Sequence, residues 1–127
     1  MPDRPVQVYI VDDDPSICIA YGRLVRSAKM EPHTFSSVQE FLSSNFTDEN
    51  ACVISDLQMP GLWAFDLPAM LERAGHHLPV IYVTAHDTRE TRERARRVGA
   101  AGYFSKPVDD QALLDTIAWA LSGQRVK

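Results

Sequence analysis

The chain has 127 residues, 45% of them hydrophobic and 24% charged, with a formal net charge of -4 at pH 7. This length fits one domain, and the composition excludes an intrinsically disordered chain and gives no sign of a polyanionic partner such as nucleic acid. The two cysteines, Cys18 and Cys52, cannot make the disulfide framework of a small secreted protein. No signal-peptide pattern opens the chain, and no apolar run is long enough to span a bilayer. We therefore expect a cytoplasmic domain with reduced thiols and no membrane segment.

The first strand and the first helix follow from the pattern of residues 6–28. Segment 6–11 is apolar and β-branched and precedes a cluster of aspartates, which predicts a buried strand. Asp14 followed by Pro15 is a common start of a helix. Apolar residues then recur at helical spacing and predict the stripe that faces the core: Ile17, Tyr21, Leu24, Val25 and Ala28.

A weaker strand, a short helix and a buried strand come next. Segment 30–35 contains Pro32, and because proline cannot donate a hydrogen bond to a neighbouring strand, we expect this strand at an edge of the sheet. Ser37, or the serine before it, is expected to cap a helix, since Ser37 and Glu40 have the spacing of a capping box. Segment 51–55 is continuously apolar except at its end, which predicts a parallel strand covered on both faces.

The second half of the chain repeats this alternation. Residues 64–74 form a helical pattern that Gly75 ends. The apolar segments 80–84 and 102–105 predict two more buried strands. Between them, a helix is predicted over 88–98, with a narrow inward stripe of Thr91, Ala95 and Val98. So short a stripe makes this the most weakly anchored helix.

The last helix is predicted over 109–122, with an inward stripe of Leu113, Leu114, Ile117, Ala118 and Leu121. Strands that alternate with helices over this length imply right-handed crossovers and one doubly wound parallel sheet of five strands. We therefore predict an α/β domain over residues 1–122, with a tail or the start of a linker at 123–127. Such a tail is too short for a DNA-binding module, so we expect no nucleic-acid contact by this domain and any output domain beyond residue 127.

The most conspicuous polar residues follow the carboxyl ends of the predicted strands: Asp12, Asp13, Asp14, Asp56, Thr84 and Lys106. In open α/β sheets, ligands bind at this end of the strands, where the strand order reverses, so these residues should converge in space. Asp14 is explained as an ordinary helix N-cap. Each of the others has an ordinary structural explanation when taken alone, and it is their joint position that indicates a site.

Three converging carboxylates, from Asp12, Asp13 and Asp56, indicate a site for a hard divalent cation. Each pair repels by about 4 kcal/mol at a separation of about 4 Å and an effective dielectric constant of about 20, unless a cation intervenes. Mg²⁺ prefers oxygen ligands and commonly joins carboxylates to a phosphate. Lys106 and Thr84 would supply a positive charge and a hydroxyl donor for phosphate oxygens. With these parts in place, Asp56 can attack phosphorus and form an aspartyl phosphate.

Four motifs occur in order along the chain: Val-Asp-Asp-Asp-Pro at 11–15, Ser-Asp-Leu-Gln-Met-Pro-Gly at 55–61, Val-Thr-Ala at 83–85 and Gly-Tyr-Phe-Ser-Lys-Pro at 102–107. Together they resemble the response-regulator receiver domains of two-component signalling, including those attached to LuxR-type transcription factors. The match covers nearly the whole chain. It implies a flavodoxin-like fold with five helices and strand order 2-1-3-4-5, and a switch that takes its phosphoryl group from a histidine kinase or a phosphotransfer protein. It implies no enzymatic turnover beyond the domain's own phosphorylation and dephosphorylation.

The resemblance also assigns a role to each residue of the acidic cluster. Asp56 would be the phosphoacceptor. Asp13, Asp56 and the backbone carbonyl of Gln58 would bind Mg²⁺ directly, and Asp12 would reach the ion through water. Lys106 would pair with the phosphoryl oxygens.

The remaining implied residues belong to the switch. Thr84 would be the switch hydroxyl and Tyr103 the aromatic that changes rotamer, with a cis peptide before Pro107. The fourth helix, fifth strand and fifth helix would report the change, and a homodimer through these elements is one form that the output could take. The loop after Asp56 departs from the family at Trp63 and Ala64, and since alanine is costly where φ must be positive, we expect this loop to follow a different path.

Two other functions fit part of the sequence. A haloacid-dehalogenase-type phosphatase also uses an aspartate nucleophile with Mg²⁺, and Asp12 with Asp14 forms an Asp-x-Asp pair. Against it, Pro15 follows directly, the chain has no length for a substrate cap, and Asp56 would have no explanation. A degenerate receiver that only binds partners is the third alternative, favoured by the altered loop.

The arginines and histidines favour no additional site. Residues 89–97 contain five arginines, but three glutamate–arginine pairs at i,i+4 spacing are typical of a solvated helix face rather than a nucleic-acid surface. The four histidines share no ligand spacing, which argues against zinc.

Overall fold

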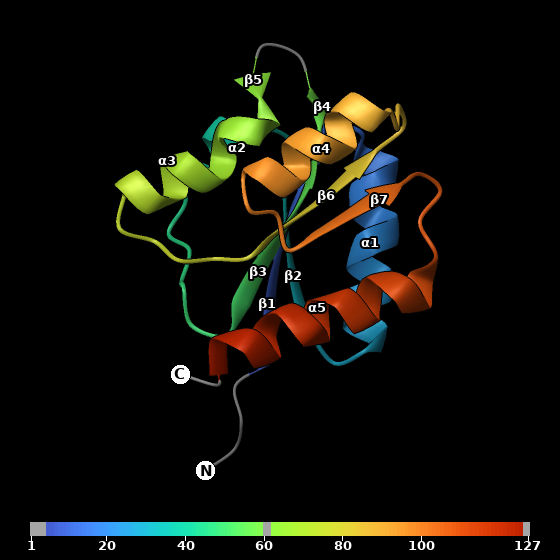
Figure 1. The fold of residues 1–127 in the computed structure, drawn as a ribbon. Coiled ribbons are helices and arrows are strands. Elements are labelled where there is room, and N and C mark those ends of the chain that lie inside the picture. The colour runs from blue at the N-terminus through green and yellow to red at the C-terminus, as the bar shows by residue number, and fades with distance from the viewer. Residues whose placement is uncertain (1–4, 60–61, 126–127) are drawn as a thin grey trace.

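The computed structural model describes residues 5–59 and 62–125, which form a parallel sheet between two layers of helices (Figure 1). The five strands lie in the order β2-β1-β3-β6-β7, and all four neighbouring pairs are parallel. Their bounds are β1 (Gln7–Val11), β2 (Glu31–Phe35), β3 (Ala51–Asp56), β6 (Val80–Thr84) and β7 (Gly102–Ser105). The predicted order 2-1-3-4-5 is confirmed, with β6 and β7 as the fourth and fifth strands, and the proline-containing strand β2 lies at an edge.

A second, two-stranded sheet interrupts the numbering of the main strands. Its strands β4 (Gln58–Met59) and β5 (Leu62–Trp63) are antiparallel, and Gln58 pairs with Trp63. This hairpin was not predicted from the sequence, because two-residue strands leave no periodic pattern. It forms the loop that follows Asp56.

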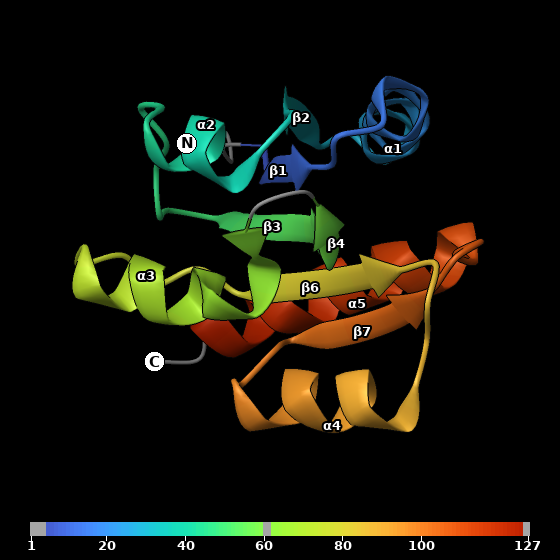
Figure 2. The same ribbon diagram turned by 90° about the horizontal axis from the view of Figure 1, so that it is seen from above.

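The helices divide between the two faces of the sheet, as Figure 2 shows from above. Helices α1 (Pro15–Ser27) and α5 (Asp110–Arg125) cover one face. On the other face lie α2 (Val38–Leu42), the 3-10 turn η1 (Ala64–Asp66) with α3 (Leu67–Arg73), and α4 (Arg89–Arg97). Five α-helices were predicted and five are found among the described residues.

Each central strand contributes side chains to two separate hydrophobic cores. Along β1, Val8 and Ile10 pack toward α1 and α5, whereas Tyr9 and Val11 pack toward α2 and α3. All four side chains are buried. Burial on both faces explains why these strands read as continuous apolar runs rather than as alternating patterns.

The helix ends follow the expected capping chemistry. The Asp14 carboxylate accepts a hydrogen bond from the Ser16 backbone N–H at 3.0 Å, and the Ser37 hydroxyl accepts one from Glu40 N–H at 3.0 Å. The Glu40 carboxylate in turn accepts a hydrogen bond from the backbone N–H of Ser36 instead of from that of Ser37. Helix α3 ends at Arg73, and Gly75 follows two residues later with a φ of 85°, which is accessible to glycine without steric cost.

Two predicted helix stripes were partly wrong. In α1 the buried residues are Cys18, Gly22 and Val25, one position away from most of the predicted stripe, and Ala28 is exposed. Gly22 lies next to Pro32 of β2, so the small residues occupy the closest approach to the sheet and the large residues Ile17, Tyr21 and Leu24 flank it. A stripe predicted from the largest apolar residues therefore misses the centre of the contact between α1 and the sheet.

The second error concerns α5. Leu113, Ile117 and Leu121 are buried as predicted, but Ala118 is exposed and Ala120 is buried in its place. The helix also continues to Arg125, three residues beyond the predicted end at Ser122. Alanine is compatible with either environment, so the sequence alone could not orient this part of the helix. No helix in the described part of the chain has the length and apolar character needed to cross a membrane.

Candidate functional site

The predicted site residues meet at the carboxyl ends of the central strands. Asp12 directly follows β1, Asp56 ends β3 and Thr84 ends β6. All three are buried, with exposed fractions of 2%, 6% and 0%, although each is polar. Parallel strands carry their carboxyl ends to one edge of the sheet, so residues that are far apart in the sequence come together here.

The carboxylates of Asp12, Asp13 and Asp56 form one cluster. Each residue offers a ligand oxygen, and these oxygens lie within 4.8 Å of one another. Asp12 and Asp56 are buried and Asp13 is exposed, so the cluster opens to solvent on the Asp13 side. Within the described residues this is the one group of three or more acidic, histidine or cysteine ligands with such a spacing. Its all-oxygen donor set suits a hard divalent cation.

Lys106 lies against the buried side of this cluster. Its Nζ donates a hydrogen bond to Asp12 Oδ2 at 3.1 Å and lies 3.7 Å from Asp56 Oδ1. Burial lowers the pKa of Lys106, but the hydrogen bond to Asp12 and the charges of Asp56 and Asp12 outweigh it, so the net shift is upward. The lysine is therefore positively charged at neutral pH and neutralises part of the acidic cluster.

Asp56 is held in place but is electrostatically unfavourable as an anion. Its Oδ1 accepts a hydrogen bond from the Gln58 backbone N–H at 3.2 Å. Burial raises the pKa of Asp56, and the charges of Asp12 and Asp13 raise it further, against the opposing effects of Gln58 and Lys106. A cation at the cluster would oppose this shift, because its charge stabilises the anionic carboxylates of Asp56, Asp12 and Asp13.

The end of β6 is tied both to β7 and to the following loop. Thr84 Oγ1 accepts a hydrogen bond from the His86 backbone N–H at 3.0 Å, and the Thr84 carbonyl accepts one from the Lys106 N–H at 2.7 Å. The peptide between Lys106 and Pro107 is cis, as the family resemblance implied. The hydroxyl of Thr84 and the ammonium of Lys106 are thus positioned from neighbouring strands.

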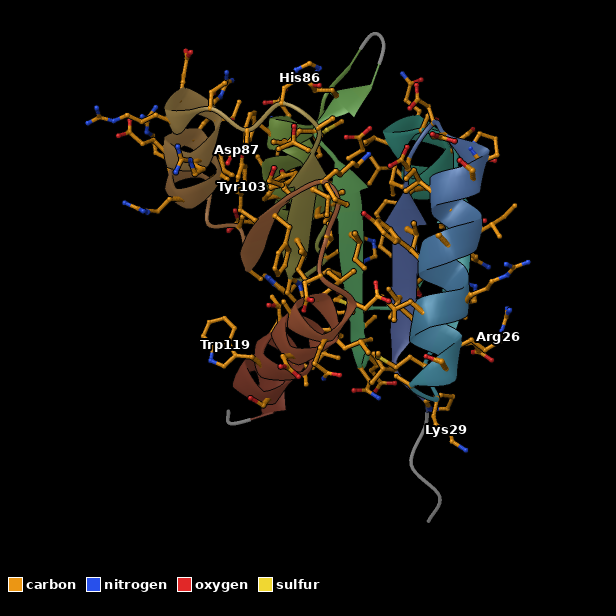
Figure 3. The ribbon with its side chains drawn as sticks, turned by 90° about the vertical axis from the view of Figure 1, so that its right-hand side faces the viewer. Arg26, Lys29, His86, Asp87, Tyr103 and Trp119 are labelled. Carbon is orange, nitrogen blue, oxygen red and sulfur yellow. The ribbon has the colours of Figure 1, made fainter. Side chains whose placement is uncertain are left out.

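Tyr103 of β7 is bound to the α4 side of the domain instead of to the acidic cluster. Its hydroxyl lies 2.7 Å from Thr91 Oγ1 and donates a hydrogen bond to Asp87 Oδ1 at 3.0 Å. Figure 3 shows Tyr103 and Asp87 side by side near α4. Asp87 was not predicted as a site residue, because a single exposed aspartate before a helix carries no distinctive signal.

The loop after Asp56 takes a path that avoids positive φ at Ala64. Among the described residues other than glycine, positive φ occurs at Lys29 and Asn50, and Ala64 instead begins the 3-10 turn η1. The buried Tyr82 hydroxyl donates a hydrogen bond to the Ala64 carbonyl at 2.6 Å. The backbone of Trp63 pairs with Gln58, but its side chain lies outside the described residues, and so do the two residues before Leu62.

Tyr82→Phe is expected to destabilise this loop. The substitution leaves the Ala64 carbonyl, which belongs to a fully buried residue, without its donor, and an unsatisfied buried acceptor costs about 1–3 kcal/mol. Urea denaturation should show this loss in the free energy of unfolding. Tyr21→Phe is the matched control, since the half-buried Tyr21 hydroxyl has no hydrogen-bond partner in the part of the chain that the structure describes. Equal stability of the two variants would show that the bond to Ala64 contributes nothing.

Comparison with known sequences agrees with the geometry. The family model of the response regulator receiver domain matches residues 8–118. Nodulation protein W of Bradyrhizobium diazoefficiens is 36% identical over 118 residues, which cover 93% of this chain and 52% of that protein. The response regulator protein TodT of Pseudomonas putida is 33% identical over 121 residues, covering 95% of this chain and 53% of TodT. The chain therefore spans about half the length of these relatives.

Comparison with solved structures gives the same fold. A response regulator receiver protein from Burkholderia phymatum has a TM-score of 0.79 at 38% sequence identity, covering 94% of this chain and 96% of that chain. The crystal structure of FixJ-N has a TM-score of 0.83 at 24% identity, and the match covers 96% of both chains.

Proposed function

The chain belongs to the response regulator receiver domain family, whose function is phosphorylation-dependent switching, and on this basis we propose that Asp56 is its phosphoacceptor. The observation that carries the proposal is the position of Asp56 Oδ1, 3.7 Å from Lys106 Nζ and inside the cluster with Asp12 and Asp13. The donor is a histidine kinase or a phosphotransfer protein. In the transfer, an Asp56 oxygen forms a bond to phosphorus while the bond from phosphorus to the donor's histidine nitrogen breaks, and that nitrogen keeps the electron pair.

The residues around Asp56 fit a Mg²⁺ ion. Asp13 and Asp56 would hold it with the backbone carbonyl of Gln58, and Asp12 would contact it through water. When bound, Mg²⁺ neutralises the clustered carboxylates and the incoming phosphoryl oxygens. Lys106 would pair with one phosphoryl oxygen and the Thr84 hydroxyl would donate to another.

Mg²⁺ is expected to raise the melting temperature of the domain, because it binds the assembled carboxylates of the folded state. At a concentration 100 times the Kd, the gain in stability would be about 2.7 kcal/mol. Asp13→Asn should remove most of this gain, whereas Asp109→Asn, at the exposed start of α5, should leave it unchanged. Thermal denaturation with and without Mg²⁺ measures the effect, and a gain that survives Asp13→Asn would move the cation site elsewhere.

The switch would connect Asp56 to α4. Once the phosphoryl group is present, the Thr84 hydroxyl would move toward it, Tyr103 would change rotamer to follow, and α4 would shift. The weak attachment of α4 supports this sequence, since Ala95 is the single buried residue of that helix. Phosphorylation thus shifts a population between two states rather than building a new structure.

The output of the switch would be read on the surface of α4, β7 and α5. Trp119 of α5 is 69% exposed and projects on the same side of the molecule as α4 (Figure 3). A homodimer, or an output domain beyond residue 127, would use this surface, and DNA would be contacted by such an output domain rather than by this one. The two free cysteines, both buried, are consistent with a cytoplasmic location.

The proposal is tested by incubating the protein with Mg²⁺ and acetyl phosphate and measuring intact mass. One phosphoryl group per chain, with no continued turnover of a small phosphoester, is the expected result. Sustained hydrolysis of a small phosphoester would favour the haloacid-dehalogenase-type phosphatase. Absence of labelling, with beryllofluoride binding also absent, would favour a degenerate receiver.

A further inference from the structure

The contacts between Asp87, Tyr103 and α4 define a latch that is separate from the phosphorylation site. We propose that Asp87 holds the start of α4 against β7 in the resting domain, because it binds both the Tyr103 hydroxyl and the Arg92 side chain. When Asp87 moves, α4 is released. Asp87 is a positioning residue in this proposal. The role of the latch in signalling rests on the proposed function, but its existence in the resting state does not.

The latch joins three elements through one carboxylate oxygen. Asp87 Oδ1 accepts the Tyr103 hydroxyl hydrogen bond at 3.0 Å and lies 3.1 Å from Arg92 Nε. Tyr103 comes from β7, Arg92 from α4, and Asp87 from the loop between β6 and α4. The side chains of Arg92 and Asp87 are 56% and 32% exposed, so water screens the ion pair, and the hydrogen bond from Tyr103 carries more of the contact than the charge of Arg92 does.

Asp87 joins the loop before α4 to β7 through the Tyr103 hydroxyl. Tyr103 has one hydroxyl proton, and Asp87 is the acceptor for it. Thr91 Oγ1 lies 2.7 Å from the Tyr103 oxygen and 2.9 Å from the Thr88 carbonyl, and its single proton can be donated to one of these acceptors at a time. Without Asp87, Tyr103 and Thr91 could still bond to each other, but the loop would no longer be joined to β7.

Helix α4 has few other attachments. Ala95 is buried, Thr91 and Val98 are half-buried, and the remaining positions of the helix are exposed. The Arg94 guanidinium lies 5.0 Å from the centre of the Phe65 ring, which adds one contact with η1. With so little apolar burial, the polar contacts through Asp87 form a large part of what holds the start of α4 to the sheet.

The latch is also connected to Thr84 along the chain. Asp87 follows Thr84 by three residues, and the intervening His86 N–H donates to Thr84 Oγ1 at 3.0 Å. A Thr84 hydroxyl that moves toward a phosphoryl group would therefore pull this loop with it. Asp87 would then withdraw from Tyr103 and Arg92, and α4 would lose its tether at the same time as Tyr103 becomes free to turn.

Hydrogen exchange of the unphosphorylated chain tests the latch directly. Asp87→Ala is expected to speed exchange of the α4 amides by about tenfold, the effect of losing one hydrogen bond to a charged group. Tyr103→Phe should speed the same amides, and the double variant should exchange less than the product of the two single effects predicts. Asp87→Asn keeps an acceptor for Tyr103 and should show a smaller increase.

Glu93→Ala is the matched control, because it removes the exposed Arg89–Glu93 ion pair from the same helix without touching Tyr103. Its α4 amides should exchange at the wild-type rate within about twofold. Unchanged exchange in Asp87→Ala, or equal effects of Asp87→Ala and Glu93→Ala, would overturn the latch. Strictly multiplicative effects in the double variant would also overturn it.

Beryllofluoride binding in Mg²⁺ then separates the latch from the proposed function. Asp87→Ala should bind the mimic several-fold more tightly than the wild type, because less of the binding free energy is used to release α4. If exchange responds as expected but the wild type neither binds beryllofluoride nor is labelled, the latch stands and the proposed function fails. If the wild type is labelled but Asp87→Ala changes neither exchange nor binding, the proposed function stands and the latch fails.

Discussion

Asp56→Asn is expected to abolish labelling by acetyl phosphate, with a loss of at least about 1,000-fold in rate. The neutral amide lacks the anionic oxygen that attacks phosphorus, and no neighbouring group supplies a replacement in the same position. Asp12→Asn should still be labelled, at a reduced rate, because Asp12 contributes charge but not the nucleophile. Intact-mass analysis over time measures both rates. The opposite pattern, with labelling lost in Asp12→Asn and retained in Asp56→Asn, would identify the phosphatase arrangement instead.

The same substitution should stabilise the resting protein at neutral pH. Burial raises the pKa of Asp56 above its ordinary value of 3.8, so the folded state binds this proton more tightly than the unfolded chain does. In the wild type, the contribution of protonated Asp56 to the free energy of unfolding is therefore fully present below pH 3.8. It is lost as the pH rises through the higher pKa that Asp56 has in the folded state. Without Mg²⁺, Asp56→Asn should melt several degrees above the wild type at pH 7, and the difference should shrink toward pH 3.8. A variant that melts lower at pH 7 would contradict this electrostatic account.

Lys106→Met is expected to slow phosphorylation by about 100-fold, the usual effect of removing one charged donor from a transition state. Methionine preserves the length of the apolar stem but leaves Asp12, which is 2% exposed, without the ammonium 3.1 Å away. The variant should therefore also depend more strongly on Mg²⁺ for its thermal stability. Rapid-mixing measurements of labelling at saturating Mg²⁺ isolate the effect on the transfer itself.

Lys29→Met provides the control for loss of a lysine charge. Lys29 is exposed just beyond the C-terminal end of α1 (Figure 3), whereas Asp12 and Asp13 precede the start of that helix. Its φ of 67° is equally costly for lysine and methionine. Labelling of Lys29→Met should match the wild type. If Lys106→Met slows labelling by less than about threefold, the lysine serves only to neutralise the resting carboxylates.

The convergence of the acidic residues could be predicted because it depends on topology. Asp12 directly follows a strand whose apolar run is evident in the sequence, Asp56 and Thr84 each end such a strand, and parallel strands end at a common edge. Which side chains of α1 are buried against the sheet was harder to predict. Cys18 and Gly22 lie at the centre of the α1 contact because they are small, and a stripe chosen by size and hydrophobicity places the centre on their larger neighbours.

The tertiary partners of Tyr103 could not be predicted for a different reason. Asp87 and Thr91 are 16 and 12 residues away from Tyr103 in the sequence, and neither belongs to a motif that links them to a strand. Their contact depends on where α4 lies over β7, which the weak apolar stripe of that helix leaves almost undetermined. Local pattern specifies elements here, and long-range packing specifies which polar groups meet.

The sheet separates two hydrophobic cores, and this separation has a mechanical consequence. Tyr103 packs on the side of α4, together with the buried Tyr82 and Ala95, whereas Ile117 of α5 packs on the opposite side. Thr84 comes two residues after Tyr82 on β6, so strand alternation places it on the α4 side as well. The strands thus separate the layer that contains α4 from the layer that contains α5. A rearrangement on one side can proceed while the other side keeps the strands in register, so moving parts and a rigid frame coexist in a domain with a single sheet.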